Sequence, residues 1–232
     1  MPTHTEAVKQ VLEALENPKT GAISSLDEIG AVGHRIVHGG EAFTESTLIT
    51  DEVIAAVERV SELAPLHNPA NLIGIEACEK AMPGKPNVAV FDTAFGMNIP
   101  KKAAMYAIPY EYYEKYSIRR YGFHGTSHMF VSGETVKLLG KEDAKVIVCH
   151  IGNGASISAS IGGKCVDTSM GLTPLEGLVM GTRSGDVDPA VLQFICNHED
   201  ISVDEMLNIL NKKSGLLGIS GVSSDFRDVR QA

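Results

Sequence analysis

The stretch KVIVCHIGNGASISASIGGKCVD, residues 145–167, indicates the fold class most directly. Residues 145–151 form an apolar run typical of a buried strand, and the alternation of serine with isoleucine that follows indicates a second strand. Gly152-Asn153-Gly154 makes a glycine-rich bend between them, and Gly162-Gly163 turns the chain into a third strand at 164–167. The stretch therefore predicts a β-hairpin with a glycine-rich bend.

Two more apolar runs, 29–37 and 87–91, predict buried strands that end at His38-Gly39-Gly40 and at Asp92. Helix signals precede, separate and follow these strands. A helix is predicted over 5–16 from its apolar spacing and a Thr5 cap, and others should start at Thr50, at Asn68-Pro69 and after Thr126. Near the end of the chain, Asp188-Pro189 starts one helix, and a Ser202-x-x-Glu205 capping box starts another that ends at Gly215. This alternation predicts two α/β lobes, with ligands beyond the strand ends at Arg35, Asp92 and Asn153.

Composition excludes several classes of protein. A net charge of −9 and a pI near 5.4 argue against a general binder of nucleic acid or anionic membranes, because such surfaces need excess Lys and Arg. The four cysteines form no C-x-x-C pair, so no zinc ribbon or thioredoxin-type centre is indicated. No apolar run approaches the roughly 18 residues of a membrane helix. We expect a protein of the reducing cytoplasm.

His124 and His128 stand at the i, i+4 spacing that can chelate zinc, but Gly125-Thr126-Ser127 replaces the glutamate that usually lies between such histidines. A Gly-Thr-Ser run at a helix start offers backbone N–H groups and hydroxyls to an anion, or simply caps the helix. A buried imidazole with ordinary hydrogen bonds remains an equal alternative for His124.

The bend at His150 to Gly154 lets backbone approach a phosphate closely, because glycine has no side chain to block it. An ordinary hairpin bend explains it equally well. Arg35 and Arg183 are flanked by small or polar residues, and a buried guanidinium needs an anion, either a structural carboxylate or a phosphate. Asp92 could cap a helix or hold magnesium.

Seven segments in the same order resemble the signatures of acetate kinases: GHRIVHGGE (33–41), APLHNP (64–69), FDTAF (91–95), RYGFHGTSH (120–128), HIGNGAS (150–156), MGTRSGD (180–186) and SDFRD (224–228). The resemblance covers essentially the whole chain. It implies the actin-like ATPase (ribonuclease H-like) architecture, α/β and duplicated, with both domains incomplete here. Residues 1–94 would belong to the N-terminal domain on the acyl-substrate side, and 95–232 to the C-terminal domain on the nucleotide side.

The resemblance also implies an activity and a set of roles. The reaction would be phosphoryl transfer between ATP and acetate, giving acetyl phosphate and ADP, with Mg²⁺ or Mn²⁺, in a homodimer. Asp92, near the metal and contacting it indirectly, would be catalytic, together with His124 and Arg183. The implied acid-binding residues are Arg35, Val37, Leu66, His67, Phe123 and Pro174. The implied nucleotide-binding residues are His150, Ile151, Gly152, Asn153, Gly154, Asp225, Phe226 and Arg227.

Two departures from the family pattern stand out. The N-terminal strand with its phosphate loop is absent, as is the C-terminal stretch with a further nucleotide loop and a glutamate near the metal. The chain also opens on a helix, whereas α/β proteins usually begin with a strand. We therefore expect a fragment that is inactive alone. Two alternatives stay open: a propionate or other short-chain acyl kinase, and a catalytically silent nucleotide-binding module on the same fold.

Overall fold

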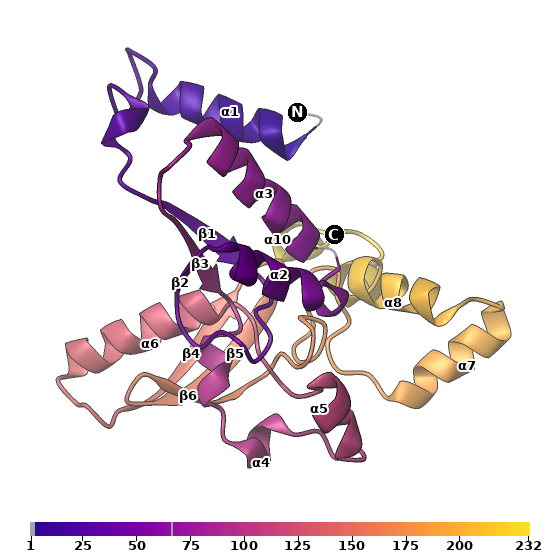
Figure 1. Ribbon diagram of the computed structural model, residues 1–232. Helices are drawn as coiled ribbons and strands as arrows, with labels where there is room; N and C mark the ends of the chain where they lie inside the picture. Colours follow the sequence, from indigo (N-terminus) through magenta and orange to yellow (C-terminus); the bar gives the residue numbers. More distant parts are fainter. Residues whose placement is uncertain (1–2, 66) are drawn as a thin grey trace. The chain divides into compact units, whose positions relative to one another are not determined.

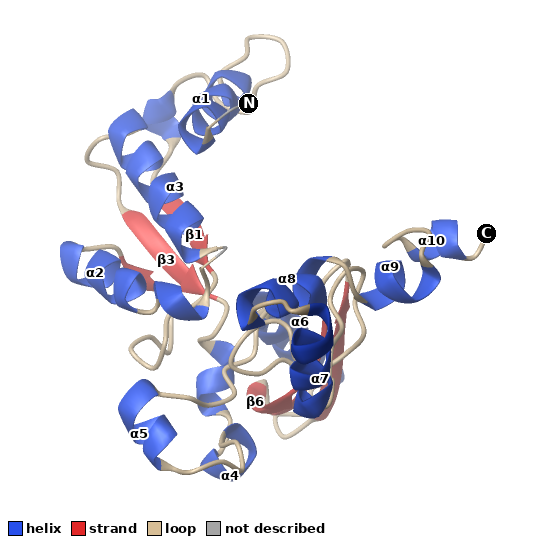
Figure 2. Ribbon diagram, turned by 90° about the vertical axis from the view of Figure 1, so that its right-hand side faces the viewer, coloured by secondary structure: helices blue, strands red, loops and turns tan. Residues whose placement is uncertain are grey.

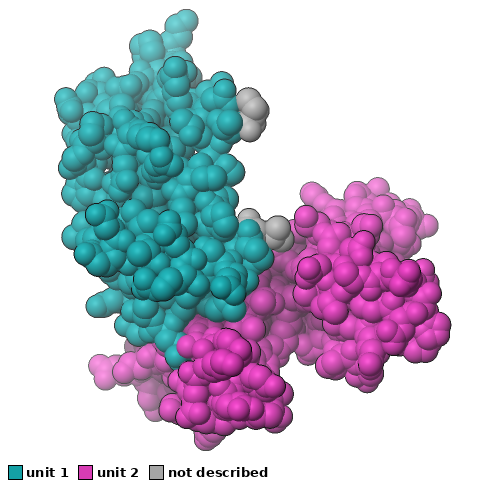
Figure 3. All heavy atoms as spheres, turned by 45° about the vertical axis from the view of Figure 1, so that its right-hand side comes forward, with its two compact units in different colours: residues 1–94 teal, residues 95–232 magenta. Residues whose placement is uncertain are grey.

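The computed structural model describes residues 3–65 and 67–232, and the chain forms two compact units, Met1–Ala94 and Phe95–Ala232 (Figures 1 and 3). The first unit runs α1 (His4–Leu15), η1 (Leu26–Glu28), β1 (Val32–Ile36), β2 (Thr47–Leu48), α2 (Asp51–Arg59), η2 (Ser61–Leu63), α3 (Asn68–Ala81) and β3 (Asn87–Phe91). The second runs η3 (Phe95–Asn98), α4 (Lys101–Ala104), α5 (Glu111–Tyr116), α6 (Gly125–Leu139), β4 (Lys145–Ile151), β5 (Ala155–Ile161), β6 (Lys164–Thr168), α7 (Pro189–Glu199), α8 (Val203–Lys212), α9 (Gly215–Ser220) and α10 (Phe226–Val229).

The first unit is built on a small sheet of order β1-β3-β2. Strands β1 and β3 pair in parallel, from Val32 opposite Asn87 to Ile36 opposite Phe91, and β2 adds to β3 antiparallel. Helices α2 and α3 pack beside it (Figure 2). The core consists of Ile36, Val53, Val57, Ile75, Ala89, Phe91 and Ala94. Because β1 and β3 run in parallel, their carboxyl ends meet at one edge of the sheet.

Local capping sets several boundaries in this unit. Thr3 caps α1 in a reciprocal box with Glu6, so the predicted Thr5 cap is wrong, and Thr5 lies inside the helix. Ser25 and Glu28 make a similar box around η1. That turn takes up the residues just before Ile29, and the strand predicted from there begins at Val32.

The second unit is built on the antiparallel sheet β4-β5-β6. The predicted hairpin is confirmed, with Lys145 opposite Ile161 and Ile151 opposite Ala155. Val146 and Val148 pack under Val136 of α6. The opposite face is open, because the side chains of Ile147 and Ile151 are 65% and 69% exposed, so the prediction of a strand buried on both faces is wrong for β4.

Later in this unit, α8 ends at Lys212 instead of continuing to Gly215. Gly215 has φ of +64° and begins the short helix α9. Among the described residues, no helix is both long and apolar enough to cross a membrane.

Candidate active site

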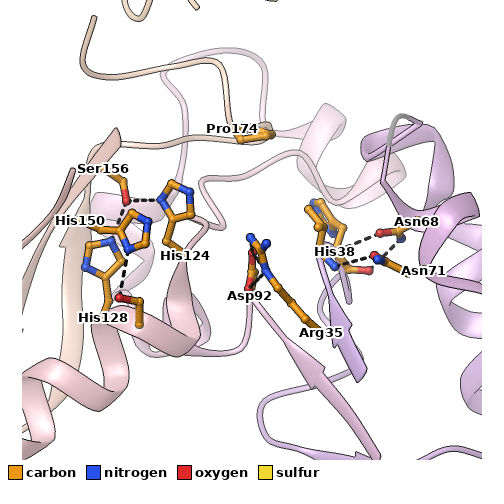
Figure 4. Close-up of polar contacts among 12 residues, drawn as sticks. Arg35, His38, Asn68, Asn71, Asp92, His124, His128, His150, Ser156 and Pro174 are labelled. Atoms are coloured by element: carbon orange, nitrogen blue, oxygen red, sulfur yellow. Dashed lines mark hydrogen bonds and ion pairs between the residues drawn. The ribbon is translucent and has the colours of Figure 1, made fainter. Parts of the chain in front are cut away.

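Arg35 and Asp92 lie together at the carboxyl edge of the first unit's sheet. Asp92 follows the last residue of β3, and its backbone N–H donates to the carbonyl of Ile36 at 2.9 Å, which extends the parallel ladder by one bond. The Arg35 guanidinium donates Nη2 to Oδ2 of Asp92 at 2.6 Å and Nε to Oδ1 at 3.1 Å (Figure 4). This two-pronged hydrogen bond to Asp92 raises the pKa of Arg35, more than burial lowers it.

The loop after β1 is held by side chains of α3 rather than by other backbone. Asn71 Oδ1 accepts from the N–H of Val37 at 3.1 Å, and Asn68 Oδ1 accepts from that of His38 at 3.1 Å, while Asn68 Nδ2 donates back to the His38 carbonyl at 3.0 Å. Gly39 has no room for a side chain, because a Cβ there would lie 2.6 Å from the Phe91 ring. These contacts fix Arg35 and Val37 relative to Asp92.

The other residues expected to bind the acid are placed as follows. Val37 is buried, and His67 is half-buried just before α3. Leu66 lies outside the described residues. In the second unit Phe123 is buried at 2% exposure, and Pro174 is half-buried in the loop before α7. Their assignment to an acyl pocket stays a prediction.

His124 is the N-cap residue of α6 and adopts a left-handed backbone, with φ of +57°. Few non-glycine residues take this conformation, and those that do often sit at functional sites. Its Nδ1 lies 2.8 Å from Ser156 Oγ, and its ring stacks on that of His150 at 4.0 Å between centroids (Figure 4).

His128, one turn along α6, is 1% exposed, and both its ring nitrogens bond serine hydroxyls, Ser156 at 2.7 Å and Ser158 at 2.8 Å. Burial, and to a smaller extent the nearby His150, lower the pKa of His128 to about 4. Because both ring nitrogens of His128 already bond serine hydroxyls, neither is left to coordinate zinc. The structure therefore gives no support to the zinc alternative.

The bend at 150–154 lies against the loop that carries Arg183. Gly152 N–H bonds the Gly154 carbonyl at 3.0 Å, and Gly181 N–H bonds the Asn153 carbonyl at 2.9 Å. A Cβ on Gly154 would lie 3.3 Å from Arg183 Nη1 and 3.5 Å from His124 Nε2. The glycine thus keeps open the position toward which an arginine and a histidine converge.

Arg183 itself is half-buried and donates Nη1 to the Pro174 carbonyl at 3.1 Å. Burial lowers its pKa. Across residues 3–65 and 67–232 no carboxylate forms an ion pair with Arg183, in contrast to Arg35. A partly desolvated guanidinium without a carboxylate is suited to an anionic ligand. The alternative of a structural salt bridge thus fits Arg35 and does not fit Arg183.

Asp225, Phe226 and Arg227 form the start of α10. Asp225 caps the helix by accepting from Arg227 N–H at 2.8 Å, and it also receives Arg227 Nη2 at 2.6 Å. This arginine lowers the pKa of Asp225 to about 2. Phe226 is 58% exposed. The backbone of this segment lies close to the arginine loop, because a Cβ on Gly181 would be 3.2 Å from the Ser224 carbonyl oxygen.

Carboxylate oxygens are the ligands magnesium prefers, and Asp92 offers them at the end of β3. Both its oxygens already accept from Arg35, so the pair fits an ion held through water better than one held directly. In the part of the chain that the structure describes, no three His, Cys, Asp or Glu side chains cluster as a metal site.

Sequence reasoning missed Asn68, Asn71, His128, Ser156 and Ser158 as parts of these networks. One signal was available for the serines. Ser156, Ser158 and Ser160 recur at every second position of β5, and the strand's alternation puts all three on the sheet face that α6 covers. Polar residues on a buried face need partners, and His128 on α6 supplies two of the bonds.

The model of the acetokinase family matches residues 1–232. The acetate kinase of Agathobacter rectalis is 64% identical over 234 residues, and that of Helicobacter hepaticus 63%. The matches take in all of this chain but 59% and 58% of those relatives, so the chain spans about three fifths of their length.

Two solved structures resemble this one closely. The acetate kinase of Porphyromonas gingivalis has a TM-score of 0.92 at 54% identity, with 100% of this chain and 59% of that one covered. A propionate kinase from Francisella tularensis has a TM-score of 0.91 at 49% identity, with 98% and 58% covered. The predicted α/β fold is confirmed by these similarities.

Proposed function

This chain belongs to the acetokinase family, and we propose that the protein containing it transfers a phosphoryl group reversibly between ATP and acetate, giving acetyl phosphate and ADP. The observation that carries the proposal is the position of Arg183, which is half-buried, has no carboxylate partner in residues 3–65 and 67–232, and converges with His124 on Gly154. Two such donors beside a glycine suit the oxygens of a transferring phosphoryl group.

The first unit would bind the acid. The Arg35 side chain is 63% exposed, so its guanidinium could engage a carboxylate or an acyl phosphate with one edge while the other edge holds Asp92. Val37, Leu66 and His67 would contribute to the pocket for the methyl group. A carboxylate is already charged and needs no strong base, so Asp92 acts by positioning rather than by taking a proton.

The second unit would bind the nucleotide and supply charge. Residues 150–154 would lie against the phosphates, with backbone N–H groups as donors. Asp225, Phe226 and Arg227 would line the adenosine pocket, and Phe123 and Pro174 would contribute to the acyl pocket. His124 and Arg183 would stabilise the in-line transition state.

A divalent ion, Mg²⁺ or Mn²⁺, neutralises phosphate charge in this chemistry, and Asp92 is the residue of this chain that would contact it, through water. We also propose that the protein works as a homodimer in the cytoplasm.

The second candidate is a propionate kinase, which the similarity to the Francisella tularensis protein favours. The two acids differ by one methylene, worth about 1–3 kcal/mol in an apolar pocket. To test both, the full-length protein would be assayed for acyl phosphate with ATP and either acid. A higher kcat/KM for acetate supports the first candidate, a higher value for propionate supports the second, and no product from either refutes the proposal.

A further inference from the structure

Four side chains of the second unit form one continuous line of hydrogen bonds: Ser158, His128, Ser156 and His124. The three bonds measure 2.8, 2.7 and 2.8 Å, and Figure 4 shows Ser156 between the two imidazoles. The first three residues of the line are at most 1% exposed. Bulk water does not reach these three side chains, so each of their polar hydrogens must be donated to a neighbour in the line.

The direction of donation follows from counting protons, since each hydroxyl has one. In the described part of the chain, the Ser158 hydroxyl has one hydrogen-bond partner, Nδ1 of His128, so it donates there. The opposite direction would leave its proton buried without an acceptor. A neutral His128 then carries its proton on Nε2 and donates to Ser156.

The neutral form of His128 has independent support. Its burial and the nearby His150 lower its pKa to about 4, so it is uncharged at neutral pH. Ser156 accepts this N–H and must use its own proton on the remaining neighbour, Nδ1 of His124. A neutral His124 whose Nδ1 accepts carries its proton on Nε2.

We propose that His128, Ser156 and Ser158 are positioning residues that set the tautomer of His124, so that its Nε2 is a hydrogen-bond donor. That nitrogen lies 3.5 Å from the position of a Cβ on Gly154, and Arg183 Nη1 lies 3.3 Å from the same position. The guanidinium of Arg183 is always a donor, so with His124 protonated on Nε2 both groups donate toward one place. With the other tautomer, a lone pair there would face the oxygens of an anion and repel them.

This inference rests on the proposed function in one respect, that His124 meets the transferring phosphoryl group. The first test uses the full-length protein with Ser156→Ala and a matched control, Ser160→Ala. Ser160 lies on the same face of β5, is 2% exposed, and bonds the Val146 carbonyl outside the relay. We expect Ser156→Ala to lower kcat about tenfold or more with little change in either KM, and Ser160→Ala to leave kcat near that of the parent. Equal losses in both variants would overturn the inference.

A double-mutant cycle separates positioning from a general structural effect. In a His124→Ala background, Ser156→Ala should cost nothing more, because the group through which it acts is gone. The same loss in both backgrounds would refute the relay. Two variants of His128 provide a further test. His128→Gln keeps a hydrogen-bond donor toward Ser156, whereas His128→Leu has none, so the glutamine variant should retain a much higher kcat. Equal loss in these two variants also speaks against the relay.

The tautomer can be read without turnover. Histidine labelled with ¹⁵N in the ring, observed by two-bond ¹H–¹⁵N correlation in the full-length protein, shows which nitrogen carries the proton, and His124→Gln assigns the signal. We expect the proton of His124 on Nε2 in the parent and in Ser160→Ala, and a mixture of tautomers in Ser156→Ala. A proton on Nδ1 in the parent overturns the inference. If the protein forms no acyl phosphate, the proposed function fails, while the ring signals still decide the tautomer.

Discussion

Arg35 and Asp92 form a two-pronged ion pair whose two members differ sharply in exposure, 63% for the arginine side chain and 2% for the aspartate. The carboxylate is therefore committed to this partner, whereas the guanidinium keeps one edge for a ligand. The pair follows from topology, since β1 and β3 are parallel neighbours and their ends meet.

Arg35→Ala should act on both binding and stability. It removes the proposed anion contact, so KM for acetate should rise roughly tenfold or more, the equivalent of a lost charge-assisted hydrogen bond. It also leaves Asp92 buried without its partner, at a cost of about 1–3 kcal/mol in the free energy of unfolding. Kinetics and urea unfolding of the full-length protein measure these effects. Arg59→Ala, an exposed arginine of α2, is the control. An unchanged acetate KM in Arg35→Ala would remove Arg35 from the acid site.

Val37→Ala should shift the preference between acids. The residue is 5% exposed at the end of β1, and removing two methyl groups there would enlarge a pocket for the acyl group. We expect relative kcat/KM for propionate to improve by about tenfold at most. Val53→Ala provides the control, because Val53 is similarly buried, at 7%, in the core of the same unit. If both variants leave the ratio fixed, Val37 does not line the pocket.

The buried His128 should make stability depend on pH. Its pKa is about 4 in the folded protein, against 6.5 for an ordinary histidine, so between pH 6.5 and about pH 4 the unfolded chain binds a proton that the folded one does not. The stability that comes from keeping His128 neutral in the fold is therefore fully present above pH 6.5, and it is lost as the pH falls toward 4. Melting temperatures of the full-length protein and of His128→Gln, compared at pH 7 and pH 5, measure it. We expect the melting temperature of the parent to fall more between pH 7 and pH 5 than that of His128→Gln. Equal falls in the two proteins would contradict the lowered pKa of His128.

Some of the fold was predictable because its signals are local. The hairpin of β4 and β5 follows from alternation and a glycine bend, and α2 and α8 begin at the predicted caps, Thr50 and Ser202. The exposed face of β4 was not predictable, because Ile147 and Ile151 have the same hydrophobicity as buried strand residues. Periodicity reports which residues share a face, not what covers that face.

For the candidate active site, the sequence indicated which loops carry the polar residues but not which side chains bond one another. Arg35 and Asp92 are 57 positions apart, and their bond depends on strand pairing that no local pattern specifies. The relay through Ser156 is a stronger example, since the sequence around His124 and His128 suggested an anion site or a helix cap and gave no sign that serines of β5 bond both rings. Only the packing of α6 on β5 shows that a serine hydroxyl bonds a ring nitrogen of each histidine.

Residues 1–232 expressed alone should not form acetyl phosphate. Phosphoryl transfer depends on positioning, and the chain spans only about three fifths of the length of the acetate kinases that it matches. Apolar side chains on the open face of β4 and on α6, including Leu138 at 91% exposure, should also promote aggregation. A hydroxamate assay beside the full-length protein tests this. Turnover within about tenfold of that control would show the prediction to be wrong.

Arg183→Ala tests the central proposal most directly. The guanidinium is half-buried, donates to the Pro174 carbonyl, and has no carboxylate to neutralise in the described residues, so its loss leaves no buried anion unpaired. Folding should therefore change little, whereas kcat should fall roughly 100-fold or more from the loss of one preorganised donor to the transition state. KM for ATP should change much less.

Two further variants make this result specific to the guanidinium at position 183. Arg183→Lys keeps the charge but loses the planar fork, and should recover only part of the lost kcat. Arg230→Ala removes an exposed arginine of the same unit and should leave kcat unchanged. Steady-state kinetics in both directions, with melting temperatures for each variant, provide the measurement. Near-normal turnover of a well-folded Arg183→Ala would leave Arg183 a structural residue that braces the Pro174 loop.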